Sequence, residues 1–256
     1  MNPRDELKAL LAQKELFIFD LDGTLFNTLG DLAPAVNYAM KQFRLQTHSN
    51  DDVRTFIGNG SVNLIRRAVA ANYIDVIKIR NFDEVAAVLE REGYSEERIK
   101  EIHKVYSEYY WEHCTENTEP YKGVVELIKR IANRTGSKGY CAGIKCAAML
   151  TNKPIAPAQK ILEKFGLEKS FATYLCGDTT PERKPSPAGI FEILRQTGIT
   201  PEKAIIIGDD TPDVLAAKNA NIDCITLFEG FGKAENLLPL SPRYTAGHIK
   251  DFAEFI

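Results

Sequence analysis

The sequence predicts an α/β protein in which a doubly wound sheet of parallel strands is interrupted by an all-helical insert. Five short apolar runs lack the polar–apolar alternation of half-exposed strands, as expected for strands that a parallel sheet buries on both faces. Segments with helical spacing of apolar residues separate most of these runs, which is the order that right-handed crossovers require. One long stretch after the first run contains helical patterns and no convincing strand.

The elements of the sheet follow one another along the chain. Strands are expected at residues 16–19, 146–150, 174–176, 204–207 and 224–227. Helices are expected around residues 124–131, 161–165, 190–194 and 214–217. Gly166 and Gly198 follow the second and third of these helices, at positions where glycine commonly ends a helix, and Asn221 follows the fourth.

The insert has a different pattern. Apolar residues recur at helical spacing in residues 32–43, 62–69 and 99–109, with no strand between them. We therefore predict a Rossmann-like core formed by residues 1–30 and 113–256, and a separate small helical domain formed by residues 31–112.

Composition excludes several classes of protein. The 256 residues are 44% hydrophobic and 26% charged, which is ordinary for a globular chain, and the net charge is −3. No block of basic residues indicates nucleic acid as a partner, and no apolar run reaches the roughly 18 residues that span a bilayer. The charged N-terminal stretch does not resemble a signal peptide, and an odd number of cysteines suits a reducing compartment. The expected location is the cytoplasm.

A glycine-rich and basic segment at residues 133–145 precedes the second strand. Cys141 and Cys146 could be considered as metal ligands, but a single pair at this spacing lacks the second pair that zinc sites use. The segment is better interpreted as a long surface turn.

Polar clusters follow three of the predicted strands. Asp20 and Asp22 come after the first strand, and Thr151 begins a polar stretch after the second. Asp209 and Asp213 come after the strand at 204–207. Because ligands of open α/β sheets bind beyond the carboxyl ends of the strands, we expect these clusters to form one site.

Four carboxylates at one site repel one another unless a cation compensates their charge. Mg²⁺ prefers oxygen ligands and leaves room for water and phosphate, so it is the expected cofactor. Any one of these aspartates could instead cap the helix that follows its strand. Four of them at two neighbouring strand ends favour a metal site.

Four motifs resemble those of the haloacid dehalogenase-like hydrolase superfamily, and they occur in the same order. They are Phe19-Asp20-Leu21-Asp22-Gly23-Thr24-Leu25, Leu150-Thr151-Asn152-Lys153, Lys184-Pro185-Ser186-Pro187, and Gly208-Asp209 with Asp213. The helical insert after the first motif resembles the cap of the superfamily's first cap class. The joint match covers nearly the whole chain.

Within that superfamily, the chain is most similar to the bacterial phosphoglycolate phosphatases. The similar stretches are 29–37, 53–60, 64–68, 151–154 and 228–232. Asn27 stands where those enzymes usually carry aspartate. The resemblance implies hydrolysis of 2-phosphoglycolate to glycolate and phosphate. The residues alone leave other small substrates open (pyrophosphate, a nucleotide or a sugar phosphate), as well as a catalytically silent binding module.

The resemblance also implies roles for the aspartates. Asp20 would be the nucleophile that forms an aspartyl-phosphate, and Asp22 would be the general acid and base. Mg²⁺ would bind Asp20, Asp209 and the backbone carbonyl of Asp22, while Asp213 would act from outside the ligand set.

The remaining roles concern the substrate. Thr151, Asn152 and Lys184 would bind the phosphoryl group, with Thr151 and Lys184 counted as catalytic. Asn59 and Arg67 of the insert would contact the rest of the substrate. The expected partner is a small phosphorylated metabolite, and the expected assembly is a monomer or a homodimer.

Overall fold

A computed structural model describes residues 2–75, 81–135, 141 and 144–256. The chain divides into two compact units. One unit comprises Met1–Asn27 and Glu119–Ile256, and is called the core unit below. The other comprises Thr28–Thr118 and is called the helical unit.

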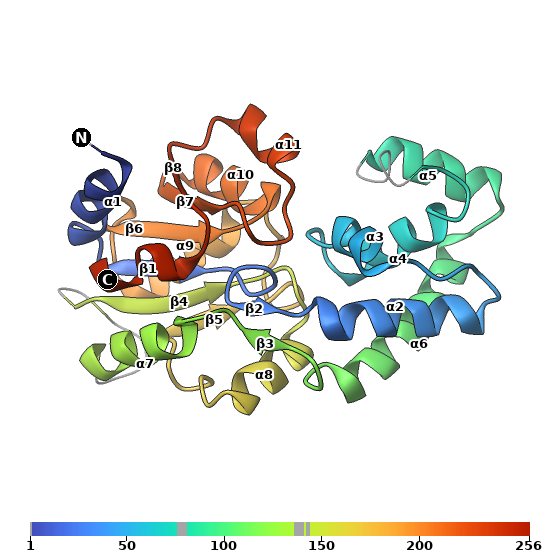
Figure 1. The fold of residues 1–256 in the computed structure, drawn as a ribbon, viewed down its shortest axis with the longest axis horizontal. Coiled ribbons are helices and arrows are strands. Elements are labelled where there is room, and N and C mark those ends of the chain that lie inside the picture. The colour runs from blue at the N-terminus through green and yellow to red at the C-terminus, as the bar shows by residue number, and fades with distance from the viewer. Residues whose placement is uncertain (1, 76–80, 136–140, 142–143) are drawn as a thin grey trace. The chain divides into compact units, whose positions relative to one another are not determined.

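The core unit contains the predicted parallel sheet. Its strands are β1 (Leu16–Phe19), β4 (Cys146–Leu150), β5 (Thr173–Leu175), β6 (Ala204–Gly208), β7 (Asp223–Leu227) and β8 (Tyr244–Ala246). Their order is β5-β4-β1-β6-β7-β8 and every pairing is parallel, with β1 between β4 and β6 (Figure 1). The sequence did not indicate β8, because this edge strand has only three residues and one of them, Thr245, is exposed.

Helices cover both faces of this sheet. They are α1 (Pro3–Ala12), α7 (Val124–Thr135), α8 (Ile155–Lys164), α9 (Ala188–Thr197), α10 (Thr211–Ala220) and α11 (Ala234–Leu237), with short 3-10 turns at Pro201–Lys203, Leu238–Leu240, Ile249–Asp251 and Ala253–Phe255. Gly198 and Asn221 end α9 and α10 in the left-handed conformation, as expected from the sequence.

Alternate residues of β1 belong to two separate hydrophobic clusters. Phe17 and Phe19 pack with apolar residues of α1, α7 and α8. Leu16 and Ile18 pack with residues of α9 and α10. Because all four residues are fully buried, β1 is the centre of a three-layer, doubly wound core, and the predicted fold class is confirmed.

The register of the sheet aligns the polar strand ends. Phe19 pairs with Met149 of β4 and with Ile207 of β6. The residues just beyond these positions, from Asp20, Thr151 and Asp209 onward, therefore emerge at one edge of the sheet.

The helical unit contains α2 (Leu29–Gln42), α3 (Asn50–Phe56), α4 (Ser61–Ala70), α5 (Phe82–Arg91) and α6 (Glu96–His113). Side chains at the residues before the helices cap several of them, including Ser49 in a capping box with Asp52. The carboxylate of Asp31 accepts hydrogen bonds from the backbone N–H groups of Asn117 and Thr118, both at 2.8 Å. This contact joins the beginning and the end of the unit.

Two very short strands flank the helical unit. β2 (Phe26–Asn27) pairs antiparallel with β3 (Glu119–Pro120), so that Asn27 lies opposite Glu119. The chain therefore leaves and re-enters the core unit through adjacent backbone segments. In the described part of the chain, no helix has both the length and the apolar character needed to cross a bilayer.

Candidate active site

Asp20 follows β1 directly. Its backbone N–H donates to the carbonyl of Ile207, 3.0 Å away, which extends the pairing of β1 with β6 by one residue. Its carboxylate Oδ1 lies 2.8 Å from Nζ of Lys184, and the Asp20 side chain is 12% exposed. The sheet therefore presents this carboxylate at its edge with a cation beside it.

The turn after Asp20 brings a second strand end close to the first. Gly23 has φ +85°, a conformation that strongly favours glycine, and its N–H donates to the carbonyl of Phe26 at 2.9 Å. A Cβ atom on Gly23 would lie 2.2 Å from Oδ2 of Asp209. The absence of a side chain at this position is what allows the two strand ends to approach.

Asp209 is held by a cradle of donors. Thr24 Oγ1 donates to its Oδ1 at 2.5 Å, and the N–H of Phe231 donates to its Oδ2 at 2.7 Å. A Cβ on Gly230 would lie 2.3 Å from the Asp209 Cβ, so the backbone of the 228–232 segment can pass only as glycine there. The sequence analysis noted residues 228–232 only as a stretch similar to the related enzymes. In the structure this segment holds the Asp209 side chain in place.

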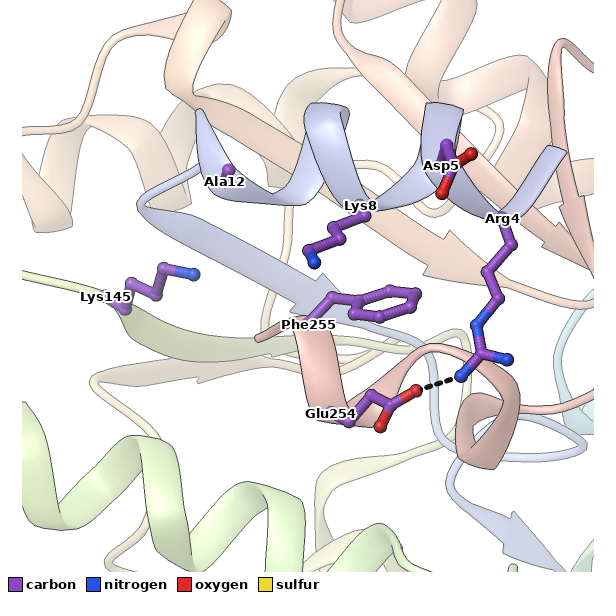
Figure 2. Close-up of a pocket in the computed structure, with 7 residues that line it drawn as sticks. All are labelled: Arg4, Asp5, Lys8, Ala12, Lys145, Glu254 and Phe255. Carbon is purple, nitrogen blue, oxygen red and sulfur yellow. Dashed lines mark hydrogen bonds and ion pairs between the residues drawn. The ribbon is translucent and has the colours of Figure 1, made fainter. Parts of the chain in front are cut away.

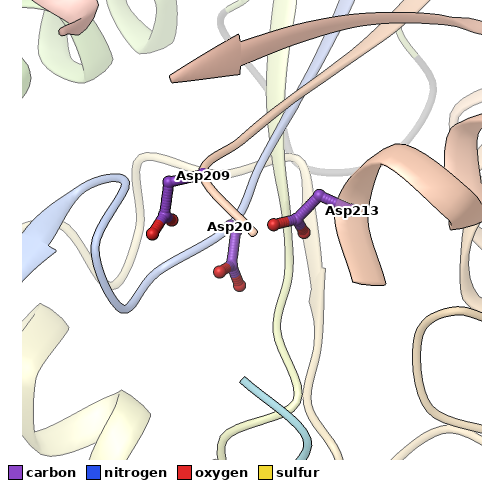
Figure 3. A group of neighbouring side chains, drawn as sticks. All are labelled: Asp20, Asp209 and Asp213. Carbon is purple, nitrogen blue, oxygen red and sulfur yellow. The ribbon is translucent and has the colours of Figure 1, made fainter. Parts of the chain in front are cut away.

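Three carboxylates gather at this edge. One oxygen from each of Asp20, Asp209 and Asp213 lies within 4.8 Å of the others, and Figure 3 shows the three side chains together. Burial raises the pKa of Asp20 to about 7, against the opposing effect of the Lys184 ammonium. Burial and the charges of Asp20 and Asp213 also raise the pKa of Asp209 well above its ordinary value.

The charges of this cluster indicate what it can hold. With all three carboxylates ionised, Lys184 compensates only one negative charge, so a divalent cation would complete the balance. The donors are oxygens alone, which is the set that Mg²⁺ prefers. The cluster therefore fits a magnesium ion, with Asp20 and Asp209 as carboxylate ligands. The Asp22 carboxylate does not belong to the three-oxygen group.

Lys184 is the buried cation of the site. Its Nζ lies 2.8 Å from Asp20 and 2.6 Å from Asp213, and its side chain is 2% exposed. Burial lowers the pKa of Lys184, but the two carboxylates outweigh burial and the pKa stands above its ordinary value. This lysine is therefore charged at any physiological pH.

Asn152 holds the main chain of Lys184. Its Nδ2 donates to the Lys184 carbonyl at 3.0 Å, and its Oδ1 accepts from the Lys184 N–H at 2.9 Å. This arrangement differs from the side-chain contact with a phosphoryl group that the sequence suggested. The Asn152 amide fixes the main chain of Lys184 through these two bonds, and its predicted contact with a phosphoryl group stays a prediction.

Thr151 lies at the end of β4. Its N–H donates to the carbonyl of Leu175 at 3.0 Å, and its hydroxyl accepts from the N–H of Lys153 at 3.2 Å. A hydroxyl that accepts one bond keeps its own proton for donation. Thr151 is therefore able to donate a hydrogen bond, and its contact with a phosphoryl oxygen stays a prediction.

Asp22 lies outside the carboxylate cluster and pairs with a different lysine. Lys153 Nζ lies 2.9 Å from Oδ1 and 3.2 Å from Oδ2 of Asp22. Lys153 was recognised in the sequence as part of a motif, but no role was predicted for it. Its position one residue after Asn152 in a strand-end cluster was the available signal.

Asp210 is the N-cap residue of α10. Its side chain accepts from the N–H of Thr211 at 2.8 Å, and its own N–H donates to Oδ2 of Asp213 at 3.2 Å. The capping box thus fixes Asp213 against the helix start while its other oxygen faces Lys184.

The two predicted substrate residues of the helical unit have different surroundings. Asn59 lies in the turn between α3 and α4, flanked by Gly58 and Gly60, and is partly exposed. Arg67 is only 1% exposed, and its Nη1 donates to the carbonyls of Phe56 at 2.9 Å and Ile57 at 3.3 Å. The guanidinium thus binds backbone carbonyls at the end of α3, and the contact of Arg67 with substrate stays a prediction.

Two further features lie apart from these residues. Much of the 133–145 segment falls outside the described residues, while Cys141 and Cys146 are buried free thiols, and burial raises the pKa of both. A cavity of about 710 Å³ is lined by Arg4, Asp5, Lys8, Ala12, Lys145, Glu254 and Phe255 (Figure 2). Arg4 pairs with Glu254 there, and none of the predicted site residues lines it.

Comparisons with known proteins agree with this geometry. A phosphoglycolate phosphatase from Psychrobacter arcticus is 33% identical, over 90% of this chain and 90% of its own. Phosphoglycolate phosphatase 1 from Pseudomonas aeruginosa is 32% identical, over 92% of this chain and 77% of its own. The crystal structure of a predicted phosphoglycolate phosphatase from Haemophilus somnus has a TM-score of 0.77 and 28% identity, and the match covers 94% of this chain and 97% of that one.

The match to a protein-family model extends over most of the chain, including the residues of the candidate site. Residues 17–227 match the family model of the haloacid dehalogenase-like hydrolases, a range that begins in β1 and ends with β7. It includes the carboxylate cluster, Lys153, Lys184 and the whole helical unit. The chain is an enzyme of the phosphoric monoester hydrolase class, and it belongs to the haloacid dehalogenase-like hydrolase family.

Proposed function

We propose that this enzyme is a magnesium-dependent phosphatase that hydrolyses a small phosphate monoester through an aspartyl-phosphate on Asp20. The observation that carries the proposal is the Asp20 carboxylate at the end of the central strand, 2.8 Å from the Lys184 ammonium. A carboxylate in such a position is suited to attack phosphorus, because its charge is balanced and its orientation is fixed. Bound Mg²⁺ would reduce the repulsion between the carboxylates and the phosphate.

In the first half of the reaction, Asp20 attacks phosphorus and the ester oxygen leaves. Thr151 donates a hydrogen bond to a phosphoryl oxygen, and Lys184 neutralises charge as it spreads over the phosphoryl group. Asp22 supplies a proton to the leaving oxygen, which an alkoxide leaving group requires.

In the second half, water hydrolyses the aspartyl-phosphate. Asp22 now accepts the proton that water loses as it attacks phosphorus, and the bond between phosphorus and Asp20 breaks. Phosphate is released, and both aspartates return to their starting states. The metal ligands in this scheme are Asp20, Asp209 and the backbone carbonyl of Asp22, with Asp213 acting through Lys184.

We propose 2-phosphoglycolate as the substrate, with glycolate and phosphate as products. The support is that relatives about 30% identical to this chain, over most of both chains, are named phosphoglycolate phosphatases. Discrimination among esters must come from contacts beyond the phosphate, since every substrate offers that group. Asn59, in the partly exposed turn between α3 and α4, is the residue proposed to make such a contact.

A panel of phosphate esters with Mg²⁺ tests this function. The panel contains 2-phosphoglycolate, p-nitrophenyl phosphate, pyrophosphate, a nucleoside monophosphate and a sugar phosphate, with the Asp20→Asn variant as the control. We expect the highest kcat/KM for 2-phosphoglycolate and no turnover by the variant. A preference for another member would change the substrate and keep the chemistry. No turnover of any member would indicate a catalytically silent binding module.

A further inference from the structure

The reaction scheme above uses Asp22 but gives no role to Lys153, the lysine that pairs with it. The lysine Nζ contacts both carboxylate oxygens of Asp22, at 2.9 and 3.2 Å. The Lys153 side chain is 3% exposed and that of Asp22 is 15% exposed. A lysine is rarely this buried unless its ammonium has a specific partner, so the contact is a built part of the site.

The backbone of Lys153 is fixed on both sides. Its N–H donates to the hydroxyl of Thr151 at 3.2 Å, and its carbonyl accepts from the N–H of Gly177 at 2.9 Å. A Cβ on Gly177 would lie 2.3 Å from the Asn152 carbonyl oxygen, so this close approach requires glycine. The ammonium therefore extends from a rigid point at the strand ends.

Lys153 and Lys184 contact different carboxylates of the site. Lys184 contacts Asp20 and Asp213, which belong to the group of oxygens that fits a metal ion. Lys153 contacts Asp22, whose carboxylate is outside that group although it follows Asp20 by only two residues. The ammonium of Lys153 attracts the Asp22 carboxylate and so opposes the attraction of that carboxylate to a divalent ion.

We propose that Lys153 is the positioning residue that holds the Asp22 carboxylate away from the metal ligands and in place for proton transfer. This inference rests on the proposed phosphatase function. Lys153 acts through Asp22 and does not touch the reacting atoms. Its contribution covers both halves of the reaction: the ester oxygen takes a proton from Asp22 as its bond to phosphorus breaks, and the attacking water gives a proton back to Asp22.

The Lys153→Met variant tests this role with p-nitrophenyl phosphate. p-Nitrophenolate leaves without needing a proton, so Asp20 should still be phosphorylated quickly. Hydrolysis of the aspartyl-phosphate still needs Asp22, and general base catalysis is worth roughly 10²- to 10⁴-fold. We expect a burst of p-nitrophenolate approaching one equivalent of enzyme, followed by a slow steady rate. A variant that is slow without a burst, although folded, would overturn the proposal.

A double-mutant cycle shows whether Lys153 acts through Asp22. In the Asp22→Asn background, adding Lys153→Met should cause no further loss of kcat, because the group that Lys153 positions is already gone. Losses that multiply would show that Lys153 acts on something else. The inhibition constant for inorganic phosphate should be the same for Lys153→Met and wild type. A clear increase would assign Lys153 to phosphate binding instead and overturn the proposal.

Removing one member of a buried ion pair can unfold a protein. If Lys153→Met does not fold, the comparison of Asp22→Asn with Asp22→Asn/Lys153→Met remains, since the double variant leaves no unpaired charge. Equal rates support the proposal and a further loss overturns it. Lys169→Met, which removes an exposed lysine beyond α8, is the matched control. If the wild type hydrolyses no ester, the proposed function fails, and that result is distinct from every outcome of the cycle.

Discussion

Lys184 and Asp213 form an ion pair in which Nζ lies 2.6 Å from Oδ1 and each side chain is only 2% exposed. Asp213 also receives the Asp210 N–H in the capping box of α10. One carboxylate thus joins the start of a helix to the cation that faces Asp20. The contact explains how an aspartate outside the proposed ligand set affects the nucleophile.

Asp213→Asn should therefore lower both stability and activity. Breaking a buried ion pair costs about 3–5 kcal/mol, because the remaining charge loses its compensation. We expect a lower free energy of unfolding in urea and a kcat/KM reduced by at least about tenfold, which corresponds to only 1.4 kcal/mol of lost transition-state stabilisation. Asp210→Asn is the matched control, since asparagine caps a helix as well as aspartate does. Equal losses in the two variants would assign Asp213 to helix capping alone.

The roles of Asp20 and Asp22 can be distinguished by comparing esters with different leaving groups. Asp20→Asn should abolish turnover of every ester and form no aspartyl-phosphate, because the nucleophile is lost. Asp22→Asn should reduce turnover of alkyl phosphates by roughly 10²- to 10⁴-fold, while phosphorylation by aryl phosphates is reduced less. Single-turnover measurements with both kinds of ester provide the comparison. An equal loss in the phosphorylation step for the two kinds would contradict the acid role of Asp22.

Removal of divalent metal should abolish activity. EDTA treatment followed by gel filtration is expected to leave an inactive enzyme, because Lys184 balances only one of the three clustered carboxylates. Mg²⁺ should restore the full rate. Gly23→Ala should bind Mg²⁺ more weakly in calorimetry, since its Cβ would lie 2.2 Å from Asp209 Oδ2. Full activity in metal-free buffer would refute the metal site.

The stability of the metal-free enzyme should fall as pH rises. Burial raises the pKa of Asp20 from 3.8 to about 7, and the pKa of Asp209 is also raised. Between about pH 4 and pH 7 the folded state therefore binds more protons than the unfolded state, and the free energy of unfolding decreases with pH. We expect a lower Tm at pH 8 than at pH 5 in EDTA, and a larger increase in Tm on adding Mg²⁺ at pH 8.

The Asp20→Asn variant is the control for this pH effect. Its Tm in EDTA should depend less on pH over the same range, because one of the two displaced carboxyl groups is gone. Titration of groups away from the site cancels in the difference between wild type and variant, whereas the raised pKa of Asp209 falls with the loss of the Asp20 charge and adds to the expected difference. An identical pH dependence for both proteins would show that Asp20 does not carry the effect.

The two residues of the helical unit should behave differently. Arg67→Ala removes hydrogen bonds to two buried carbonyls and the contact of the guanidinium with the Phe82 ring, 5.0 Å from its centroid. We expect a loss of about 2–4 kcal/mol of stability, with equal effects on kcat/KM for 2-phosphoglycolate and p-nitrophenyl phosphate. Asn59→Ala should leave Tm unchanged and lower kcat/KM for 2-phosphoglycolate alone. Loss of selectivity in Arg67→Ala at unchanged stability would return that residue to a role in substrate binding.

The core unit could be predicted from the sequence because strands buried on both faces appear as uninterrupted apolar runs. The apolar runs at 16–19 and 204–207 lie in β1 and β6, and the acidic residues after them gather as parallel strand ends require. β8 and the β2–β3 pair escaped detection, since two or three residues carry no periodicity.

Side-chain partners were harder to predict than positions. The sequence placed Asn152 and Arg67 among residues that contact substrate, but their polar atoms meet backbone groups 32 and 10 to 11 residues away. Such partners depend on tertiary packing, which no local pattern records. The Lys153–Asp22 pair, 131 residues apart in the chain, is a contact of the same kind. The cytoplasmic location and the assembly state stay predictions.

Because Asn27 pairs with Glu119, the helical unit is an insertion whose two ends join the core unit at adjacent positions. Its two ends meet at neighbouring backbone positions, so residues 28–118 can be replaced by a short turn without a break in any strand of the six-stranded sheet. The carboxylates and both lysines stay behind on the remaining scaffold. In the proposed function, the residue that selects the substrate and the residues that perform the chemistry therefore belong to different segments of the chain, so the first can change while the second are conserved.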